Sequence, residues 1–173
     1  MADLNHDPSG VMPTEPPPSV LAVFEVSPAG DPDLYLERLC ELIESAEKIS
    51  ASADFEREEI DVQGLPRWFT SYPSEDAGIM EAGRQHYFRQ RPGQDDWDVQ
   101  EWISCFDGRL RRWTWWGGLR EGLRVTAWVN THSEPVVPME ELWWALFSAG
   151  ATGVSGPTMV PTSEWAARAR ITS

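Results

Sequence analysis

The sequence predicts an α+β fold, in which one mostly antiparallel sheet carries two principal helices packed on one face. Two segments, 32–50 and 138–149, repeat apolar residues at helical spacing, and each lies between strand-like segments. Residues 123–130 alternate between apolar and polar side chains, which is typical of a strand with one buried face. The expected order is β-α-β, an irregular segment, and β-β-β-α-β. A ferredoxin-like pairing of the two β-α-β units is compatible with this order.

The chain is expected to divide into a short arm and one domain. Residues 1–18 contain five prolines and few apolar side chains that could offset the entropy lost on ordering. We therefore expect a disordered, proline-rich arm over 1–18. Residues 19–173 are long enough for a single α+β domain with its own core.

The first strand–helix–strand unit begins at residues 20–26, which are β-branched and apolar and predict an interior strand. Asp31 and Pro32 suit the cap and the first position of the helix that follows. Residues 55–62 are predicted as a strand, because their four acidic residues suit an exposed edge. The apolar stripe of the helix over 32–50 comprises Tyr35, Leu39, Leu42, Ala46 and Ile49.

The segment from 64 to 93 gives only weak signals. Ser74 is a candidate start for a short helix, although two glycines in the following residues weaken it. Residues 86–89 are read as a short strand. We expect this segment to be largely irregular.

A three-stranded meander is expected to follow. Residues 97–106 predict its first strand, and Asp107-Gly108 predicts a tight type I′ hairpin turn. The chain then returns over 109–116, a strand that Gly117-Gly118 is expected to end. The alternating residues 123–130 form the third strand.

The last elements are a helix over 138–149 and a strand over 154–160. The helix carries apolar side chains around most of its girth, so we expect it to be buried. Ser163 is expected to cap a final turn that buries Trp165.

The charge is strongly negative and unevenly distributed. The formal net charge is −14, and residues 1–63 contribute −12 of it through 15 acidic and 3 basic residues. A negative surface repels nucleic acid phosphates and anionic membranes, and it attracts basic partners at long range. The charge therefore disfavours nucleic acid and membrane partners and favours a basic protein, although acidic surfaces also serve solubility alone.

Carboxylates of the first helix and the strand after it are one candidate contact surface. They look solvated, whereas an acid–base catalytic pair needs one carboxyl that is desolvated with a raised pKa. The candidate residues for binding a basic partner here are Glu37, Glu41, Glu44, Glu58 and Glu59.

A ribbon of Trp and Arg is the rival candidate surface. Four of its members share one alternate face of the returning strand, and two lie on the polar face of the next strand. Trp and Arg dominate contact hot spots, so the ribbon could bind a partner or form a permanent oligomer interface. In the alternative reading, the rings pack against residues 64–96 with the arginines lying over them. The residues are Arg109, Arg111, Trp113, Trp115, Arg124 and Trp128.

The sequence assigns no catalytic, metal-ligating or cofactor-binding residue. A small-molecule or hydrolytic site near His132 and Glu134, completed by His86, is the enzymatic alternative. No helical zinc spacing, paired CxxC or phosphate-binding glycine motif is present. With two cysteines, no signal peptide and no apolar run of membrane-spanning length, we expect a cytoplasmic protein with reduced thiols.

The small, acidic α+β layout broadly resembles immunity proteins of bacterial toxin systems. The resemblance rests on size, charge and layout and on no motif, so it implies no role for any single residue. The expected function is a non-enzymatic protein-binding domain, of immunity or inhibitor type, that engages a basic partner.

Overall fold

The computed structural model describes residues 18–57, 59–70 and 77–172. These residues form four strands and six helices within the described ranges, with three of the helices inserted between α1 and β2. The elements are β1 (Val20–Pro28), α1 (Pro32–Ser50), α2 (Arg67–Thr70), α3 (Ala77–Gln90), α4 (Val99–Ser104), β2 (Thr114–Glu121), β3 (Arg124–Asn130), α5 (Glu140–Ser148), β4 (Ala151–Pro161) and α6 (Thr162–Thr172).

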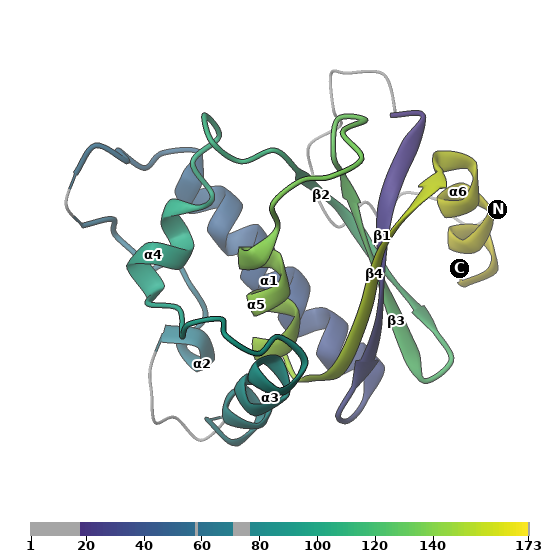
Figure 1. The fold of residues 1–173 in the computed structure, drawn as a ribbon, viewed down its shortest axis with the longest axis horizontal. Helices are drawn as coiled ribbons and strands as arrows, with labels where there is room; N and C mark the ends of the chain where they lie inside the picture. Colours follow the sequence, from purple (N-terminus) through teal and green to yellow (C-terminus); the bar gives the residue numbers. More distant parts are fainter. Residues whose placement is uncertain (1–17, 58, 71–76, 173) are drawn as a thin grey trace, which may run out of the picture.

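The four strands form one sheet in the order β2-β3-β1-β4, and every neighbouring pair is antiparallel. Helices α1 and α5 both lie against one face of this sheet (Figure 1). The α+β prediction, with two principal helices on one face, is confirmed. Because β3 lies between β1 and β2, and β1 between β3 and β4, two split β-α-β units interleave. This is the ferredoxin-like arrangement.

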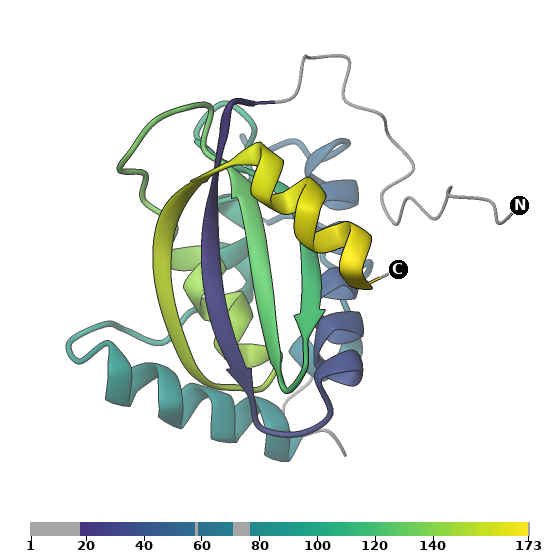
Figure 2. The same cartoon turned by 90° about the vertical axis from the view of Figure 1, so that its right-hand side faces the viewer.

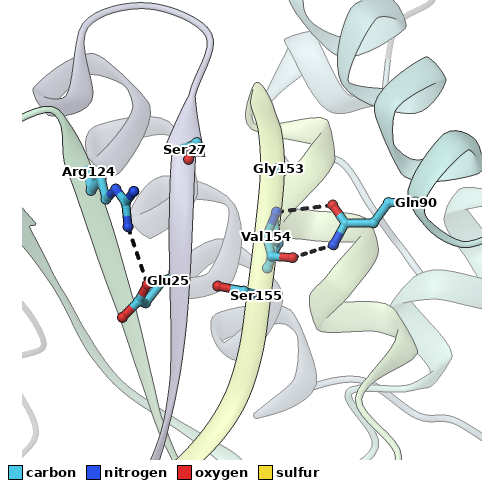
Figure 3. A pocket seen from close by; sticks show the side chains of 7 residues that line it. All are labelled: Glu25, Ser27, Gln90, Arg124, Gly153, Val154 and Ser155. Carbon is cyan, nitrogen blue, oxygen red and sulfur yellow. Dashed lines mark hydrogen bonds and ion pairs between the residues drawn. The ribbon is translucent and has the colours of Figure 1, made fainter.

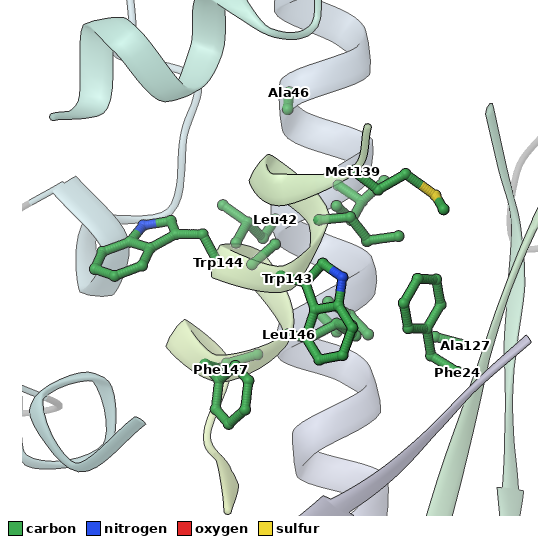
Figure 4. Packing of buried hydrophobic residues seen from close by; sticks show 14 of the residues in the cluster. Phe24, Leu42, Ala46, Ala127, Met139, Trp143, Trp144, Leu146 and Phe147 are labelled. Carbon is green, nitrogen blue, oxygen red and sulfur yellow. The ribbon is translucent and has the colours of Figure 1, made fainter. Parts of the chain in front are cut away.

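The main core fills the space between the sheet and the two principal helices. Strand periodicity turns Phe24 and Ala127 toward the helices, and Phe24 meets Trp143 of α5 edge to face at 5.4 Å between ring centroids (Figure 4). The Tyr35 hydroxyl donates to the carbonyl oxygen of Leu146 at 3.0 Å and so ties α1 to α5. The first strand and both principal helices therefore lie where their apolar patterns predict.

The opposite face of the sheet is half covered by α6 (Figure 2). Under this helix Leu21, Val23 and Trp128 form a second, smaller core, against which Trp165 packs. The rings of Trp128 and Trp165 meet edge to face at 5.6 Å. The final turn expected around Trp165 is thus a full helix that closes part of this face.

Strand β2 does not end at Gly117-Gly118, as the sequence analysis expected, but continues to Glu121. A Cβ atom at Gly117 would lie 2.9 Å from the Trp165 ring, and one at Gly118 would lie 2.3 Å from Leu36 of α1. The two glycines therefore mark the place where helices approach the strand closely from both faces.

The strand predicted over 55–62 is wrong, since the described residues of this segment form a loop. The Gln100 side chain donates to the Ile60 carbonyl oxygen at 3.1 Å and accepts from the Ile60 N–H at 2.9 Å. One side-chain amide thus satisfies the backbone groups that a neighbouring strand would otherwise pair.

The strand predicted over 97–106 is also wrong, because α4 occupies Val99–Ser104. Asp98 caps this helix by accepting from the Gln100 N–H at 2.7 Å. Trp102, Ile103 and Phe106 are spaced to bury one side of a helical turn, and all three are fully buried. The apolar residues of 97–106 recur at helical spacing, and the strand prediction did not take this spacing into account.

The hairpin turn lies at Gly122-Leu123 and not at Asp107-Gly108. Gly122 has a φ of 66°, which suits a two-residue turn between β2 and β3, whereas Gly108 is not among the described residues with positive φ. Asp107 instead follows α4 and accepts from the Arg109 N–H at 2.9 Å. The strand predicted over 86–89 is likewise wrong, because these residues belong to α3.

Two expectations fall on residues that the structure does not describe. The proline-rich arm predicted over 1–18 lies outside the described residues except for Pro18, whose carbonyl oxygen accepts from the Thr162 hydroxyl. Ser74, the candidate helix start, also lies outside them.

Candidate partner-binding surface

Three carboxylates follow one stripe on the outer side of α1. Glu37 and Glu41 are exposed and Glu44 is half-buried, because the opposite side of the helix faces the core. Their spacing of four and three residues places them one above another. Among the described residues none of the three forms an ion pair with a cation. We call these residues the α1 carboxylate row.

Other acidic residues of the same helix are paired. Asp33 pairs with Arg120 of β2, and Glu47 pairs with Arg111 at 3.1 Å. Acids near both ends of α1 thus form ion pairs with arginines from other segments, whereas the α1 carboxylate row forms none among the described residues.

Trp68 of α2 lies beside this row. Its indole N–H donates to the Glu41 carboxylate at 3.2 Å, and its ring is half-buried against the core. Phe69, the next residue, is buried against Trp102 with ring centroids 4.6 Å apart, which anchors α2. A partly exposed Trp next to uncompensated carboxylates combines an apolar anchor with charge.

The remaining two acidic candidates, Glu58 and Glu59, do not belong to the α1 carboxylate row. Glu59 is exposed in the loop after α1 and forms no ion pair within the described part of the chain. Glu58 lies outside the described residues.

The Trp and Arg residues of the rival surface do not form one exposed ribbon. Trp113 is fully buried in the main core, and its indole N–H donates to Glu141 at 2.6 Å. Trp128 is fully buried on the opposite face of the sheet. Arg111 lies over the Trp113 ring at 5.0 Å, so arginine does cover a Trp as the alternative reading expected.

The other members of this set lie apart from one another. Trp115 is half-buried against the main core. Arg109 is 62% exposed and pairs with Asp107 at 2.8 Å, next to the loop after α1. Arg124 is 67% exposed and lies 3.4 Å from Glu25. The six residues therefore share no common face, since three of them precede β2 and the other three lie on β2 and β3.

A polar hollow of about 280 Å³ is lined by residues of β1, β3 and β4 together with Gln90 at the end of α3 (Figure 3). Glu25 and Arg124 form its charged wall, and the Gln90 side chain bonds both backbone groups of Val154. The Gln90 amide occupies this position on the outer edge of β4 and blocks pairing with another strand there. The hollow is shallow and its only ion pair is solvated, so it provides no buried group for chemistry.

The histidines do not converge on one cleft. His86 lies on α3, where its Nδ1 contacts Arg89 at 3.2 Å. His132 is exposed in the loop that joins β3 to α5, at the opposite end of the molecule from α3 (Figure 1). Within the described ranges, no group of three or more His, Cys, Asp and Glu side chains could hold a metal ion. His86, His132 and Glu134 therefore do not form the single site that the enzymatic alternative requires.

Both cysteines are free and half-buried. Burial raises the pKa of the Cys40 thiol to about 12, and burial together with nearby carboxylates raises that of Cys105 to about 11. Neither thiol is therefore activated as a nucleophile.

Glu141 is a carboxylate buried at the start of α5, with only 7% of its surface exposed. Trp113 donates to its side chain, and the Trp102 indole donates to its backbone oxygen at 2.9 Å. Burial raises the pKa of Glu141, while the hydrogen bond from Trp113 and the charge of Arg111 act in the opposite direction. Sequence reasoning missed this group because its partners, Trp102 and Trp113, lie far from it in the chain.

Replacing Glu141 with glutamine is expected to change how stability depends on pH. Because the pKa of Glu141 is higher in the folded state, its contribution is fully present below the unfolded pKa of roughly 4.3 and is lost as pH rises through the folded value. The stability of Glu141→Gln relative to the wild type should therefore increase with pH across this window. Urea denaturation at a series of pH values measures the difference, and a difference that falls or stays flat would contradict the assignment.

None of the helices in the described ranges is both long and apolar enough to cross a membrane. Comparison of the chain with protein-family models, with curated proteins and with solved structures finds no match.

Proposed function

We propose that this protein is a non-enzymatic binding protein, of immunity or inhibitor type, that docks a basic protein partner on the α1 carboxylate row. One observation carries the proposal. Glu37, Glu41 and Glu44 have no cationic partner in the described structure, although acids at both ends of the same helix do. The net charge of −14 adds long-range attraction for a basic partner.

The chemistry of this surface suits lysine and arginine side chains. Guanidinium and ammonium groups would pair with the row, and the adjacent Trp68 ring offers an apolar and cation–π contact. Exposed carboxylates chiefly increase the association rate, whereas a desolvated Trp chiefly slows dissociation. We place the interaction in the cytoplasm, in keeping with two free thiols.

Removing two charges from the row is expected to weaken partner binding. Affinity capture with the wild-type protein supplies the partner, and calorimetric titration with the purified partner measures the affinity. The double variant Glu37→Gln/Glu41→Gln should bind at least about tenfold more weakly at low salt, and the difference should shrink as salt is added.

A matched control separates the surface from net charge. Asp95→Asn/Glu134→Gln removes two exposed carboxylates that form no ion pair in the described structure and lie outside α1. This pair should change the affinity less than about twofold. Equal losses in both double variants, or no stoichiometric partner at all, would refute the proposal.

A further inference from the structure

The N-terminus of α5 gathers hydrogen-bond donors around one carboxylate. Met139 precedes the helix and provides no side-chain cap, so the positive end of the helix dipole is not capped by its own neighbour. Glu140, the first helical residue, carries the carboxylate that lies there. A negative group is stabilised at this position.

Arg91 holds that carboxylate. It directly follows α3, and its Nη2 donates to both oxygens of Glu140 at 2.5 and 2.6 Å. Its guanidinium lies over the ring of Trp143 at 4.6 Å, which fixes its plane. The Nε–H of Arg91 is buried and has no acceptor. The edge of the guanidinium that carries Nε and Nη2 can bind a carboxylate through both N–H donors, but only Nη2 is used here.

Tyr87 adds a second donor without an acceptor. It lies one helical turn before Arg91 and is fully buried, and its O–H has no acceptor among the described residues. The N–H groups of Trp97 and Arg91 face the hydroxyl oxygen as donors, and the Glu140 carboxylate lies near it. A buried hydroxyl donor without an acceptor is unfavourable, so this position calls for an acceptor.

We infer that these groups form a carboxylate-binding site, in which Glu140 is the resident occupant that an external carboxylate can replace. The acceptor must be an oxyanion or a neutral oxygen, because Arg91 Nε and Tyr87 offer donors. A carboxylate fits, since one already lies on the Arg91 fork. The side chain of Glu140 is 37% exposed and can swing into solvent.

The net charge of the protein selects among oxyanions. A phosphate dianion is repelled more strongly than a monoanion by a protein of charge −14. We therefore expect a small carboxylic acid, or a carboxylate group of a larger ligand, and not a phosphate. This site is separate from the α1 carboxylate row and binds the opposite charge, so it stands or falls independently of the proposed function.

The Glu140 carboxylate competes with an external carboxylate for the site. A group tethered by a short side chain competes at an effective concentration in the millimolar range or above. Glu140→Gln removes the competing charge and leaves Arg91 and Tyr87 in place. This variant should bind acetate at least about tenfold more tightly than the wild type.

Nuclear magnetic resonance of the arginine Nε–H groups reads the site directly during an acetate titration. In Glu140→Gln the Arg91 Nε–H signal should shift and saturate with acetate, whereas inorganic phosphate should bind more weakly. The matched control Glu81→Gln removes the same charge from α3, where Glu81 contacts Arg84 at 3.8 Å outside the site. It should behave like the wild type.

Further variants distinguish acetate binding at Arg91 and Tyr87 from a general effect of the changed net charge. Adding Arg91→Gln or Tyr87→Phe to Glu140→Gln should return acetate binding to the wild-type level or near it. The inference is overturned if Glu140→Gln gains nothing, if Glu81→Gln gains as much, or if the gain survives loss of Arg91. Dispersed indole N–H signals check folding, and Glu140→Ser replaces Glu140→Gln, with the same expectations, if the latter unfolds.

Discussion

Replacing Gly83 with alanine is expected to destabilise the protein by about 3 kcal/mol or more. Gly83 lies on α3 where this helix crosses α5, and a Cβ atom there would lie 1.9 Å from the carbonyl oxygen of Phe147. The obstacle is backbone and not the flexible end of a side chain, so relief requires α3 and α5 to separate. Such a separation would loosen the contacts of Tyr87 with Trp144 and Phe147. Urea denaturation measures the loss.

Gly78→Ala provides the matched control for this substitution. It adds the same methyl group to the same helix, at a position where a Cβ would meet no atom within 4 Å. Alanine has the higher helix propensity, so this variant should be unchanged or more stable by about 0.5–1 kcal/mol. Similar effects at the two positions would show that α3 and α5 do not cross as described.

Replacing Trp128 with alanine is expected to cost about 3–5 kcal/mol. The ring is fully buried between the sheet and α6, and its indole N–H donates to the Thr126 hydroxyl at 2.9 Å. Trp165 packs on one side of it, and the Arg168 guanidinium lies 5.4 Å from its centroid. Thermal or urea unfolding gives the change in stability.

Leu123→Ala is the control for Trp128, because Leu123 lies in the hairpin turn before the same strand and is 83% exposed. It should change stability by less than about 0.5 kcal/mol. If Trp128→Ala instead kept full stability but lost partner binding, Trp128 would belong to a contact surface, as the ribbon hypothesis supposed.

The sheet and its two principal helices could be predicted because their signals are local. The apolar stripe over 32–50 and the alternation over 123–130 each lie within a single element, and β1, α1, β3 and α5 formed where expected. The order of the strands was left open, because pairing between β1 and β4 joins residues more than a hundred positions apart.

The segments that misled the sequence analysis depend on tertiary partners. The acidic segment 55–62 was predicted as an edge strand, but its backbone at Ile60 is satisfied by Gln100 and not by a strand. In 97–106 the cap at Asp98 and the helical spacing of Trp102 and Phe106 were the signals that pointed to α4.

The candidate site was predictable to a similar extent. Helical periodicity in the sequence was enough to predict that Glu37 and Glu41 lie on the outer side of the helix. The contact between Trp68 and Glu41 spans 27 residues and carries no local pattern. Trp128 was placed on the polar face of its strand, but nothing local indicated that α6 would cover that face.

Carboxyl footprinting of the protein, free and in complex with its partner, tests whether the partner binds the α1 carboxylate row. Carbodiimide labels exposed carboxylates, and mass spectrometry measures the labelling of each peptide. We expect Glu37 and Glu41 to lose most of their labelling in the complex, while Asp95 and Glu134 keep theirs. Unchanged labelling of Glu37 and Glu41 in a saturated complex would show that the partner binds elsewhere.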